Sequence, residues 1–235
     1  MKKKFKAVVF DCGNVAIPYC FSKVCYGFAE YARVWDDGLL NDGAFRKARP
    51  HEIMAAMYGD DDKNSPLRRF ERGDTLISDM GAAAFRNSIR AKFRMEITDE
   101  EFDDIWNSMF LPYDPGMLAW LEALRVAGYP LIMATNNNAI HMKFLRETYP
   151  QMFEQFERIV TSQEIGLVKS DGKIFYDHVP TAARSLVKDI EYSDMIYFDD
   201  VPAYAETFRK CGGSAVLFSE TVPAQLEAVK LGLEW

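Results

Sequence analysis

The stretch Ala-Val-Val-Phe-Asp-Cys-Gly-Asn at residues 7–14 decides the fold, because it joins a short apolar run directly to a carboxylate. A run rich in valine and phenylalanine predicts a strand that is buried in a parallel sheet. The stretch Met-Ile-Tyr-Phe-Asp-Asp at residues 195–200 repeats this pattern far downstream. A carboxylate that follows such a strand lies at the carboxyl edge of the sheet, where open α/β folds bind their ligands.

If these two strands are neighbours, the carboxylates of Asp11, Asp199 and Asp200 converge on one crevice. Like charges about 4 Å apart repel by roughly 4 kcal/mol at an effective dielectric constant of about 20. A cluster of this kind is tolerated mainly with a bound cation. The sequence therefore predicts a cation site at this edge of the sheet.

The composition limits the classes of protein to which the chain can belong. It has 235 residues, 49% of them hydrophobic, and a formal net charge of −7. This length allows one core domain with a smaller insert, and the hydrophobic content excludes general disorder. The negative charge argues against a nucleic-acid partner. The four cysteines match no zinc pattern. The apolar run after the basic start is too short for a signal peptide or membrane helix, so we expect a soluble, cytoplasmic protein without a membrane partner.

After Pro112 the sequence alternates between strand-like and helix-like stretches. Strands are expected at residues 130–135, 158–162, 195–198 and 215–218. This alternation predicts an α/β fold with a doubly wound, mainly parallel sheet and right-handed crossovers. A helical stretch is expected over residues 173–188, with Pro180 kinking or splitting it. We assign residues 1–18 and 110–235 to this core.

Residues 19–109 differ from the core in sequence pattern, because strand-like runs are replaced by apolar residues at helical spacing. Phe21, Val24, Cys25 and Phe28 show this spacing, as do Phe45, Ala48 and Arg49. Thr-Asp-Glu-Glu at residues 98–101 has the pattern of a capping box that begins a further helix. The sequence therefore predicts an all-helical cap that is inserted after the first strand.

Four polar signals follow one another in the core: Asp11, Thr135-Asn136, Lys169 and Asp199-Asp200. Taken singly, each of them could be a turn, helix-cap or solvated loop residue. Asp200 in particular could cap the helix expected from Pro202. Asn137 and Asn138 are interpreted as turn and cap residues.

As an ordered set over the whole chain, these signals resemble the haloacid dehalogenase-like superfamily of phosphatases and related hydrolases. The Asp-x-Gly-Asn sequence at residues 11–14 resembles the small-cap branch that includes sugar-phosphate phosphatases. The run Phe-Glu-Arg-Gly-Asp at residues 70–74 also looks like that branch.

The resemblance implies a reaction and a role for each residue. Asp11 would be the nucleophile that forms an aspartyl-phosphate. Mg²⁺ would be held by the carboxylates of Asp11, Asp199 and Asp200 and by the backbone carbonyl of Gly13. Lys169 would add positive charge beside Asp11. The phosphoryl oxygens would be bound by the Thr135 hydroxyl and the Asn136 backbone N–H. The implied substrate is a small phosphorylated metabolite, with sugar phosphates as a candidate class, and the implied assembly is a monomer or homodimer.

The chain departs from the family pattern at two positions. Gly13 stands where most of these phosphatases carry an aspartate that acts as general acid and base, and loss of such an acid costs about 10²–10⁴-fold in rate. A leaving group that departs easily, or an alternative acid, would reduce this loss. Ser170 stands where the catalytic lysine is often followed by proline, which loosens the expected placement of Lys169.

Substrate specificity is expected to come from the cap. Arg72 is our candidate for a cap residue that reaches the substrate, although a solvated helix face also explains such basic residues. Two other functions stay open. One is a metal-independent 2-haloacid dehalogenase, against which the Asp199-Asp200 pair argues. The other is a non-catalytic protein of the same fold that binds a phosphorylated ligand.

Overall fold

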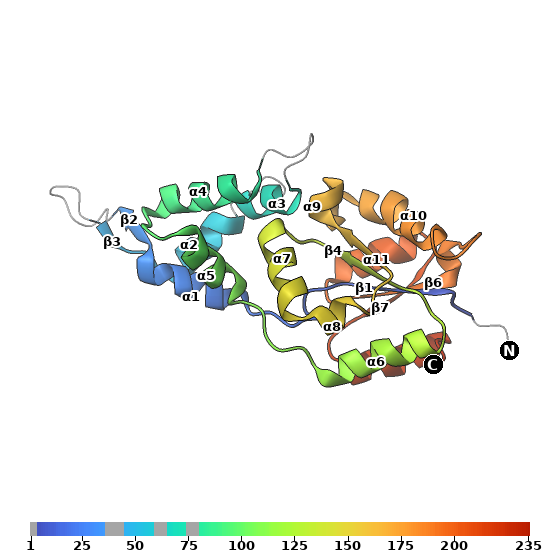
Figure 1. Ribbon diagram of the computed structural model, residues 1–235. Coiled ribbons are helices and arrows are strands. Elements are labelled where there is room, and N and C mark those ends of the chain that lie inside the picture. The colour runs from blue at the N-terminus through green and yellow to red at the C-terminus, as the bar shows by residue number, and fades with distance from the viewer. Residues whose placement is uncertain (1–3, 36–44, 59–64, 74–79) are drawn as a thin grey trace.

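The computed structural model describes residues 4–35, 45–58, 65–73 and 80–235. Figure 1 shows two adjoining parts, a sheet with flanking helices and a mainly helical part at its side. The sheet has five strands in the order β5-β4-β1-β6-β7, and every neighbouring pair is parallel. The strands are β1 (Ala7–Phe10), β4 (Leu131–Thr135), β5 (Arg158–Thr161), β6 (Met195–Asp199) and β7 (Ser214–Leu217). Each of the four downstream strands lies within one residue of its predicted bounds.

Helices cover both faces of this sheet. The bounds of the longer ones are α6 (Pro115–Val126), α7 (Ala139–Thr148), α10 (Val179–Arg184), α11 (Pro202–Lys210) and α12 (Thr221–Leu231), with short α8 (Pro150–Phe153) and α9 (Ser162–Ile165). Successive β1 residues point to opposite faces. Phe10 packs with Trp120 of α6, whereas Val9 packs in a separate cluster with Phe208 of α11. The doubly wound, parallel α/β fold is therefore confirmed.

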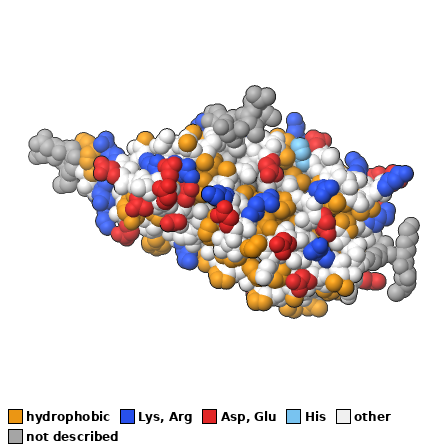
Figure 2. All heavy atoms as spheres, viewed as in Figure 1, with side chains coloured by type: hydrophobic (Ala, Val, Ile, Leu, Met, Phe, Trp, Pro, Cys, Tyr) orange, Lys and Arg blue, Asp and Glu red, His pale blue; other side chains and the backbone are white. Residues whose placement is uncertain are grey.

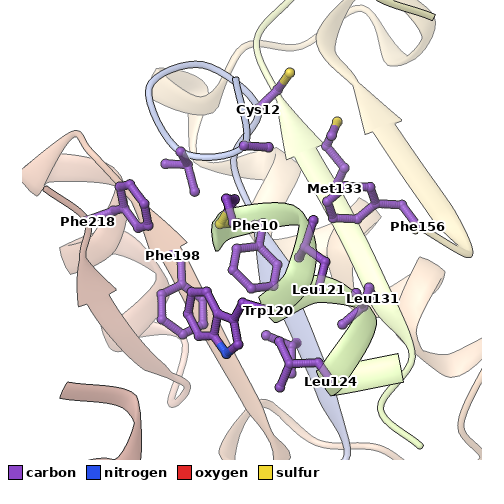
Figure 3. Packing of buried hydrophobic residues seen from close by; sticks show 14 of the residues in the cluster. Phe10, Cys12, Trp120, Leu121, Leu124, Leu131, Met133, Phe156, Phe198 and Phe218 are labelled. Carbon is purple, nitrogen blue, oxygen red and sulfur yellow. The ribbon is translucent and has the colours of Figure 1, made fainter. Parts of the chain in front are cut away.

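The cluster on one face of the sheet fixes β1 beside β6. Figure 3 shows the rings of Phe10, Trp120 and Phe198 in mutual contact. The Phe10 and Phe198 rings stack with centroids 4.7 Å apart, and Trp120 meets each of them edge-on at 5.4 and 5.0 Å. Fully burying one such side chain contributes about 1.5–3 kcal/mol. This packing holds the register in which Phe10 is paired with Phe198, so the next residues of both strands lie side by side.

The insert has an apolar core of its own. Its elements are α1 (Phe21–Tyr31), β2 (Arg33–Trp35), β3 (Phe45–Lys47), α2 (Pro50–Tyr58), α3 (Pro66–Glu71), α4 (Ala82–Phe93) and α5 (Asp99–Asn107). Phe28, Phe70, Phe85 and Trp106 are buried together in this core. The predicted capping box at Thr98 is present at the start of α5. The domain boundaries after residue 18 and before residue 110 stay a proposal.

The insert is not all-helical, and this corrects the sequence prediction. β2 and β3 form an antiparallel pair in which Trp35 faces Phe45, with ring centroids 5.4 Å apart. The spacing of Phe45, Ala48 and Arg49 had suggested a helix, but Phe45 belongs to β3. Two three-residue strands carry too little alternation to be recognised, because their pairing depends on residues far apart in the sequence.

The helical stretch expected over residues 173–188 contains a π-helical turn before Pro180 and ends at Arg184. A π-helical turn, η2 (Ile174–His178), precedes α10, and Pro180 lies in the first turn of α10. Pro180 fits there because the first N–H groups of a helix have no intrahelical acceptor. The helical run is therefore continuous from residue 173 to Arg184, with a change of hydrogen-bond pattern just before the proline, and the expected split is not present.

The surface agrees with the charge pattern of the sequence. Figure 2 shows Lys and Arg side chains interspersed with Asp and Glu over the visible face. Among the helices of the described part of the chain, none combines the length and the apolar character that a membrane span requires. All four cysteines are free thiols, and Cys12 and Cys25 are buried.

Candidate active site

The register between β1 and β6 brings three carboxylates to one edge of the sheet. The Asp11 backbone N–H donates to the Phe198 carbonyl at 2.9 Å, which continues the strand pairing by one residue. Asp11, Asp199 and Asp200 each offer a carboxylate oxygen, and these three atoms lie within 4.8 Å of one another. The structure thus brings together the acidic residues that the sequence had placed at two strand ends.

Lys169 lies at the centre of this cluster. It begins the short 3₁₀ helix η1 (Lys169–Asp171), and its side chain is 1% exposed. Its Nζ atom is 2.8 Å from Asp11 Oδ1 and 2.7 Å from Asp199 Oδ2. Burying an ammonium group is tolerated only when it is paired. The two carboxylates supply that pairing, so the lysine and the acidic cluster stabilise one another.

The loop that carries Lys169 is held by hydrogen bonds. The Lys169 backbone N–H donates to Asn136 Oδ1 at 2.8 Å, and the Val168 N–H donates to Asp171 Oδ2 at 3.1 Å. These contacts order the loop although residue 170 is serine rather than proline. They also give the Asn136 side chain a positioning role that the sequence analysis missed.

Both carboxylate oxygens of Asp199 accept hydrogen bonds from the protein. Oδ1 accepts from the Val201 backbone N–H at 2.8 Å. Oδ2 accepts from the Lys169 ammonium group and from the Tyr197 hydroxyl. Asp199 is completely buried and does not line the cavity that contains Asp11. Tyr197 was not recognised as a site residue, since in the sequence it reads as a core residue of β6.

Asp200 has different surroundings from Asp199. It lines the cavity, and its Oδ2 atom accepts from Asn14 Nδ2 at 3.0 Å. Asn14 Oδ1 in turn accepts the Tyr19 backbone N–H at 3.1 Å. Asn14 has a left-handed backbone with φ of 53°, a conformation that asparagine adopts more readily than most residues. This explains the asparagine of the Asp-x-Gly-Asn sequence, whose contact with Asp200 the sequence did not reveal.

Burial and charge shift the pKa values of this cluster. Burial raises the pKa of Asp11 to about 7, with Lys169 opposing the rise and Asp199 adding to it. Burial alone would lower the pKa of Lys169, but the charges of Asp11 and Asp199 hold it above the ordinary value. Burial also raises the pKa of Asp200. One lysine therefore does not fully compensate three carboxylates, and a further cation would favour their ionised forms.

The end of β4 forms the opposite side of the cavity. Thr135 is 1% exposed, and it lines the cavity together with Asn136, Asp11 and Lys169. Its position on the strand next to β1 brings its hydroxyl to the same sheet edge as the nucleophile candidate. The structure thus gathers the four core signals of the sequence around one cavity of about 130 Å³.

Asn138 and His141 form a closed set of hydrogen bonds at the start of α7. Asn138 Oδ1 accepts from the His141 backbone N–H at 3.0 Å, which makes Asn138 the helix cap. Asn138 Nδ2 donates to His141 Nδ1 at 3.0 Å, so Nε2 carries the proton and donates to the Trp106 carbonyl at 3.2 Å. Burial lowers the pKa of His141 to about 3, so the ring is neutral.

The cap contributes a different arginine from the expected one. Arg72 Nη2 lies 3.3 Å from Asp171 Oδ1 in the core, and Arg72 is not among the residues that line the cavity. Arg68, one turn earlier on α3, lines it together with Glu71, to which it is paired at 2.6 Å. Both arginines were visible in the sequence, but their direction depends on how α3 packs on the core. Asp74, the end of the family-like run, lies outside the described residues.

The cap contacts the core through Ser162, the first residue of α9. The Ser162 hydroxyl donates to the Glu71 carbonyl at 2.6 Å and accepts the Asn137 backbone N–H at 2.9 Å. Gly73 follows in a left-handed conformation, and a Cβ atom there would lie 2.4 Å from the Gln163 carbonyl oxygen. Figure 1 shows α3 beside α9 at this junction. Residue 73 must therefore be glycine for the cap to lie this close.

Comparisons with known proteins identify the family and the fold of the chain. A family model for haloacid dehalogenase-like hydrolases matches residues 5–212. The HAD family enzyme bt-2542 from Bacteroides thetaiotaomicron, crystallised with magnesium and inorganic phosphate, is 20% identical with a TM-score of 0.71 over 92% of this chain and 94% of that one. A protein from Porphyromonas gingivalis described as a predicted HAD-like family hydrolase is 15% identical with a TM-score of 0.73, covering 97% of this chain and 98% of that one. The L-2-haloacid dehalogenase RSc1362 is 14% identical with a TM-score of 0.58, covering 91% and 86%. At these identities the solved structures show a shared fold.

Proposed function

Because the chain belongs to the haloacid dehalogenase-like hydrolases, we propose that it is a Mg²⁺-dependent phosphatase of small phosphorylated metabolites. The observation that carries this proposal is Lys169, which bridges Asp11 and Asp199 while Asp200 and Thr135 line the same cavity. Such a site holds a carboxylate nucleophile beside positive charge and beside donors for a phosphoryl group. The magnesium and phosphate bound to the similar Bacteroides enzyme support the proposal.

The donor set suits magnesium. Mg²⁺ prefers hard oxygen ligands and is commonly held by one or two carboxylates together with substrate phosphate. Asp11, Asp200 and the Gly13 carbonyl would hold the ion, since all three residues line the cavity. Asp199 belongs to the same cluster, but both of its oxygens accept protein hydrogen bonds, so its first role is to hold Lys169. When bound, the ion would neutralise the phosphoryl oxygens and lower the repulsion between phosphate and Asp11.

The residues of the chain account for the first step of the reaction. Asp11 Oδ1 accepts from Lys169 Nζ and, at 2.6 Å, from the Cys12 backbone N–H. Oδ2 makes no hydrogen bond with a residue of the described ranges, which leaves it to attack phosphorus. A bond forms between Oδ2 and phosphorus as the bond from phosphorus to the leaving oxygen breaks, and the electron pair departs on that oxygen, which then takes a proton from water to give the alcohol. Lys169, the Thr135 hydroxyl and the Asn136 N–H would stabilise the transferring group.

Water then hydrolyses the aspartyl-phosphate, which releases inorganic phosphate and restores Asp11. The first step requires Asp11 in its ionised form. Lys169 lowers the pKa of Asp11 against the effect of burial, so the same contact that positions the nucleophile also favours its reactive state.

The test is phosphate release from p-nitrophenyl phosphate and a metabolite panel, with Mg²⁺ and with EDTA. We expect turnover that requires Mg²⁺ and falls by at least about 10³-fold in Asp11→Asn, because an amide oxygen is a poor nucleophile. Asp200→Asn should raise the Mg²⁺ concentration that gives half-maximal rate. Unchanged turnover in Asp11→Asn would contradict the proposal. Halide release from 2-chloropropionate without metal would support the dehalogenase instead, and tight binding of phosphorylated ligands without turnover would support the binding protein.

A further inference from the structure

A second cavity, of about 80 Å³, adjoins the cavity that contains Asp11, and it is called the side cavity below. Both cavities are lined by Tyr19, Tyr58 and Glu71, together with Gly13 and Asn136. In a phosphatase that acts through Asp11, the group attached to the phosphate would therefore extend into the side cavity. The inference below rests on the proposed function and concerns the chemistry of that leaving group.

Aromatic residues of the cap form one side of the side cavity, and the start of α7 forms the other. Phe21 of α1, Tyr58 at the end of α2 and Trp106 of α5 line it, and Phe110 follows α5. The Phe21 ring meets the Tyr58 ring edge-on at 5.4 Å and the Trp106 ring at 6.0 Å. Walls of this kind bind a flat apolar group through burial of its surface and through ring–ring contacts.

Several polar groups of these walls are already bonded within the protein, whereas Trp106 Nε1 is buried without a hydrogen-bond partner among the described residues. Both His141 ring nitrogens and both polar side-chain atoms of Asn138 take part in the closed set at the start of α7. Asn136 Oδ1 accepts from the Lys169 backbone N–H, and the Glu71 carboxylate is paired with Arg68. A sugar in this cavity would lose hydrogen bonds to water that the bonded groups are poorly placed to replace, with the Trp106 N–H as one donor that is left, whereas an apolar ring loses none.

We propose that the side cavity selects an aromatic leaving group, so that the substrate is a phosphate monoester of an aromatic alcohol or phenol rather than a sugar phosphate. Phe21, Tyr58 and Trp106 are the residues that determine this specificity. The phosphate binds at Asp11, and the ring lies between the cap helices and the start of α7.

The environment of Gly13 supports the same class of substrate, an ester with an aromatic leaving group. A Cβ atom on Gly13 would lie 2.9 Å from Tyr19 Cε1, so the Tyr19 ring fills the space next to the nucleophile where a side chain at residue 13 would begin. The Tyr19 ring therefore forms another aromatic wall at the place where a general acid on residue 13 would begin. A phenoxide leaves with the electron pair of the broken bond and takes a proton from water afterwards, so it depends least on such an acid.

The experiment compares benzyl phosphate with glycerol 1-phosphate in the presence of Mg²⁺. Both are esters of primary alcohols, so the two leaving groups differ little in basicity. The ratio of the two kcat/KM values therefore measures how strongly the side cavity prefers one group over the other. We expect the ratio to favour benzyl phosphate by at least about tenfold, because a hydrophobic pocket discriminates by this much for even a small apolar group. Phenyl phosphate should turn over faster than benzyl phosphate, since its leaving group needs no acid.

Phe21→Ala should lower the benzyl-to-glycerol ratio by about fivefold or more, because it removes one wall. Val126→Ala is the matched control, since Val126 is 90% exposed on α6 and the ratio should not change. Inhibition of the unmodified enzyme gives a second measurement that needs no variant: benzylphosphonate should inhibit more strongly than 2,3-dihydroxypropylphosphonate.

Two results are distinguishable. Equal or faster turnover of glycerol 1-phosphate would overturn the aromatic leaving group and leave the phosphatase proposal standing. Absence of phosphate release from every ester, p-nitrophenyl phosphate included, would overturn both.

Discussion

The core and the cap each contain a lysine paired with carboxylate, and the two pairs have nearly equal distances. In the core, Lys169 lies 2.7 Å from Asp199, and the side chains are 1% and 0% exposed. In the cap, Lys47 lies 3.0 Å from Glu30, and the side chains are 60% and 71% exposed. Water screens the second pair, whereas the first has no water to replace a lost partner. The same chemical contact is therefore expected to be important for stability and, under the proposed function, for catalysis in one region, and to be nearly neutral in the other.

The contrast extends to the roles of the two regions. The core places a cluster of buried charges at one sheet edge, where each group has a partner of opposite sign or a hydrogen bond. The cap places aromatic rings near that edge, and its Lys47–Glu30 pair is exposed to solvent. Under the proposed function, the core supplies the reacting groups and the cap supplies the walls that select the substrate.

Lys169→Met is the sharpest test of the buried pair, and we expect it to lower the free energy of unfolding by about 3 kcal/mol near pH 8 without Mg²⁺. The pKa of Asp11 is already raised to about 7 with Lys169 in place, and removal of Lys169 raises it further. A carboxyl with a raised pKa in the folded state stabilises the protein at low pH and loses that contribution as pH rises. The loss should therefore be smaller near pH 5.5, where Asp11 holds a proton. Urea unfolding at both pH values measures this, and an equal loss at both would contradict it.

Gly73→Ala tests how closely the two regions are joined. Gly73 has φ of 73°, and a Cβ atom would meet the Gln163 backbone. A left-handed conformation at alanine costs about 1 kcal/mol and the backbone clash adds to it, so we expect a loss of about 2 kcal/mol or more in unfolding free energy and a raised KM. Gly212→Ala is the matched control: Gly212 has φ of 97°, but its Cβ would meet only Tyr192 Cβ at 3.7 Å. Equal losses in the two variants would show that the clash at residue 73 has no effect.

His141→Gln tests the junction between α7 and the cap through its pH dependence. Burial lowers the pKa of His141 from 6.5 to about 3. The stability that comes from a neutral His141 is complete above pH 6.5 and is lost as pH falls toward the folded-state pKa, because the unfolded state takes up the proton first. Between about pH 8 and pH 5 the free energy of unfolding of the wild-type protein should fall by about 2 kcal/mol more than that of the variant. Urea unfolding of both proteins measures the difference. Exposed His51, changed to Gln, should keep the wild-type pH dependence.

Lys47→Met should have the smallest effect, because the exposed pair with Glu30 is screened by water. We expect the unfolding free energy to change by less than about 0.5 kcal/mol and the kcat/KM to stay as in the wild type. The pair should also weaken further in salt. A loss comparable with that of Lys169→Met would remove the distinction between the two regions.

The sequence predicted the parts of the fold that depend on local pattern. The apolar runs that became β4, β6 and β7 were found within one residue of their ends, because a buried strand must be continuously apolar. The strand-like pair β2 and β3 was missed, because each has only three residues and forms through a long-range pairing. Arg72 was chosen over Arg68 for a similar reason: the sequence gives the spacing of residues on α3 but not the rotation of that helix against the core.

The sequence by itself determined that Asp11, Thr135, Lys169 and the Asp199-Asp200 pair lie at strand ends or in the loop behind them. This follows from chain connectivity, since the carboxyl ends of parallel strands meet at one edge of a sheet. Only the tertiary structure decided which of these groups bond to one another and which of them line the cavity. Asp199 turns inward to Lys169 and Tyr197 while its neighbour Asp200 lines the cavity, and Tyr19 fills the space beside Gly13. Such differences between adjacent residues arise from packing across segments distant in the chain, which no local pattern of residues records.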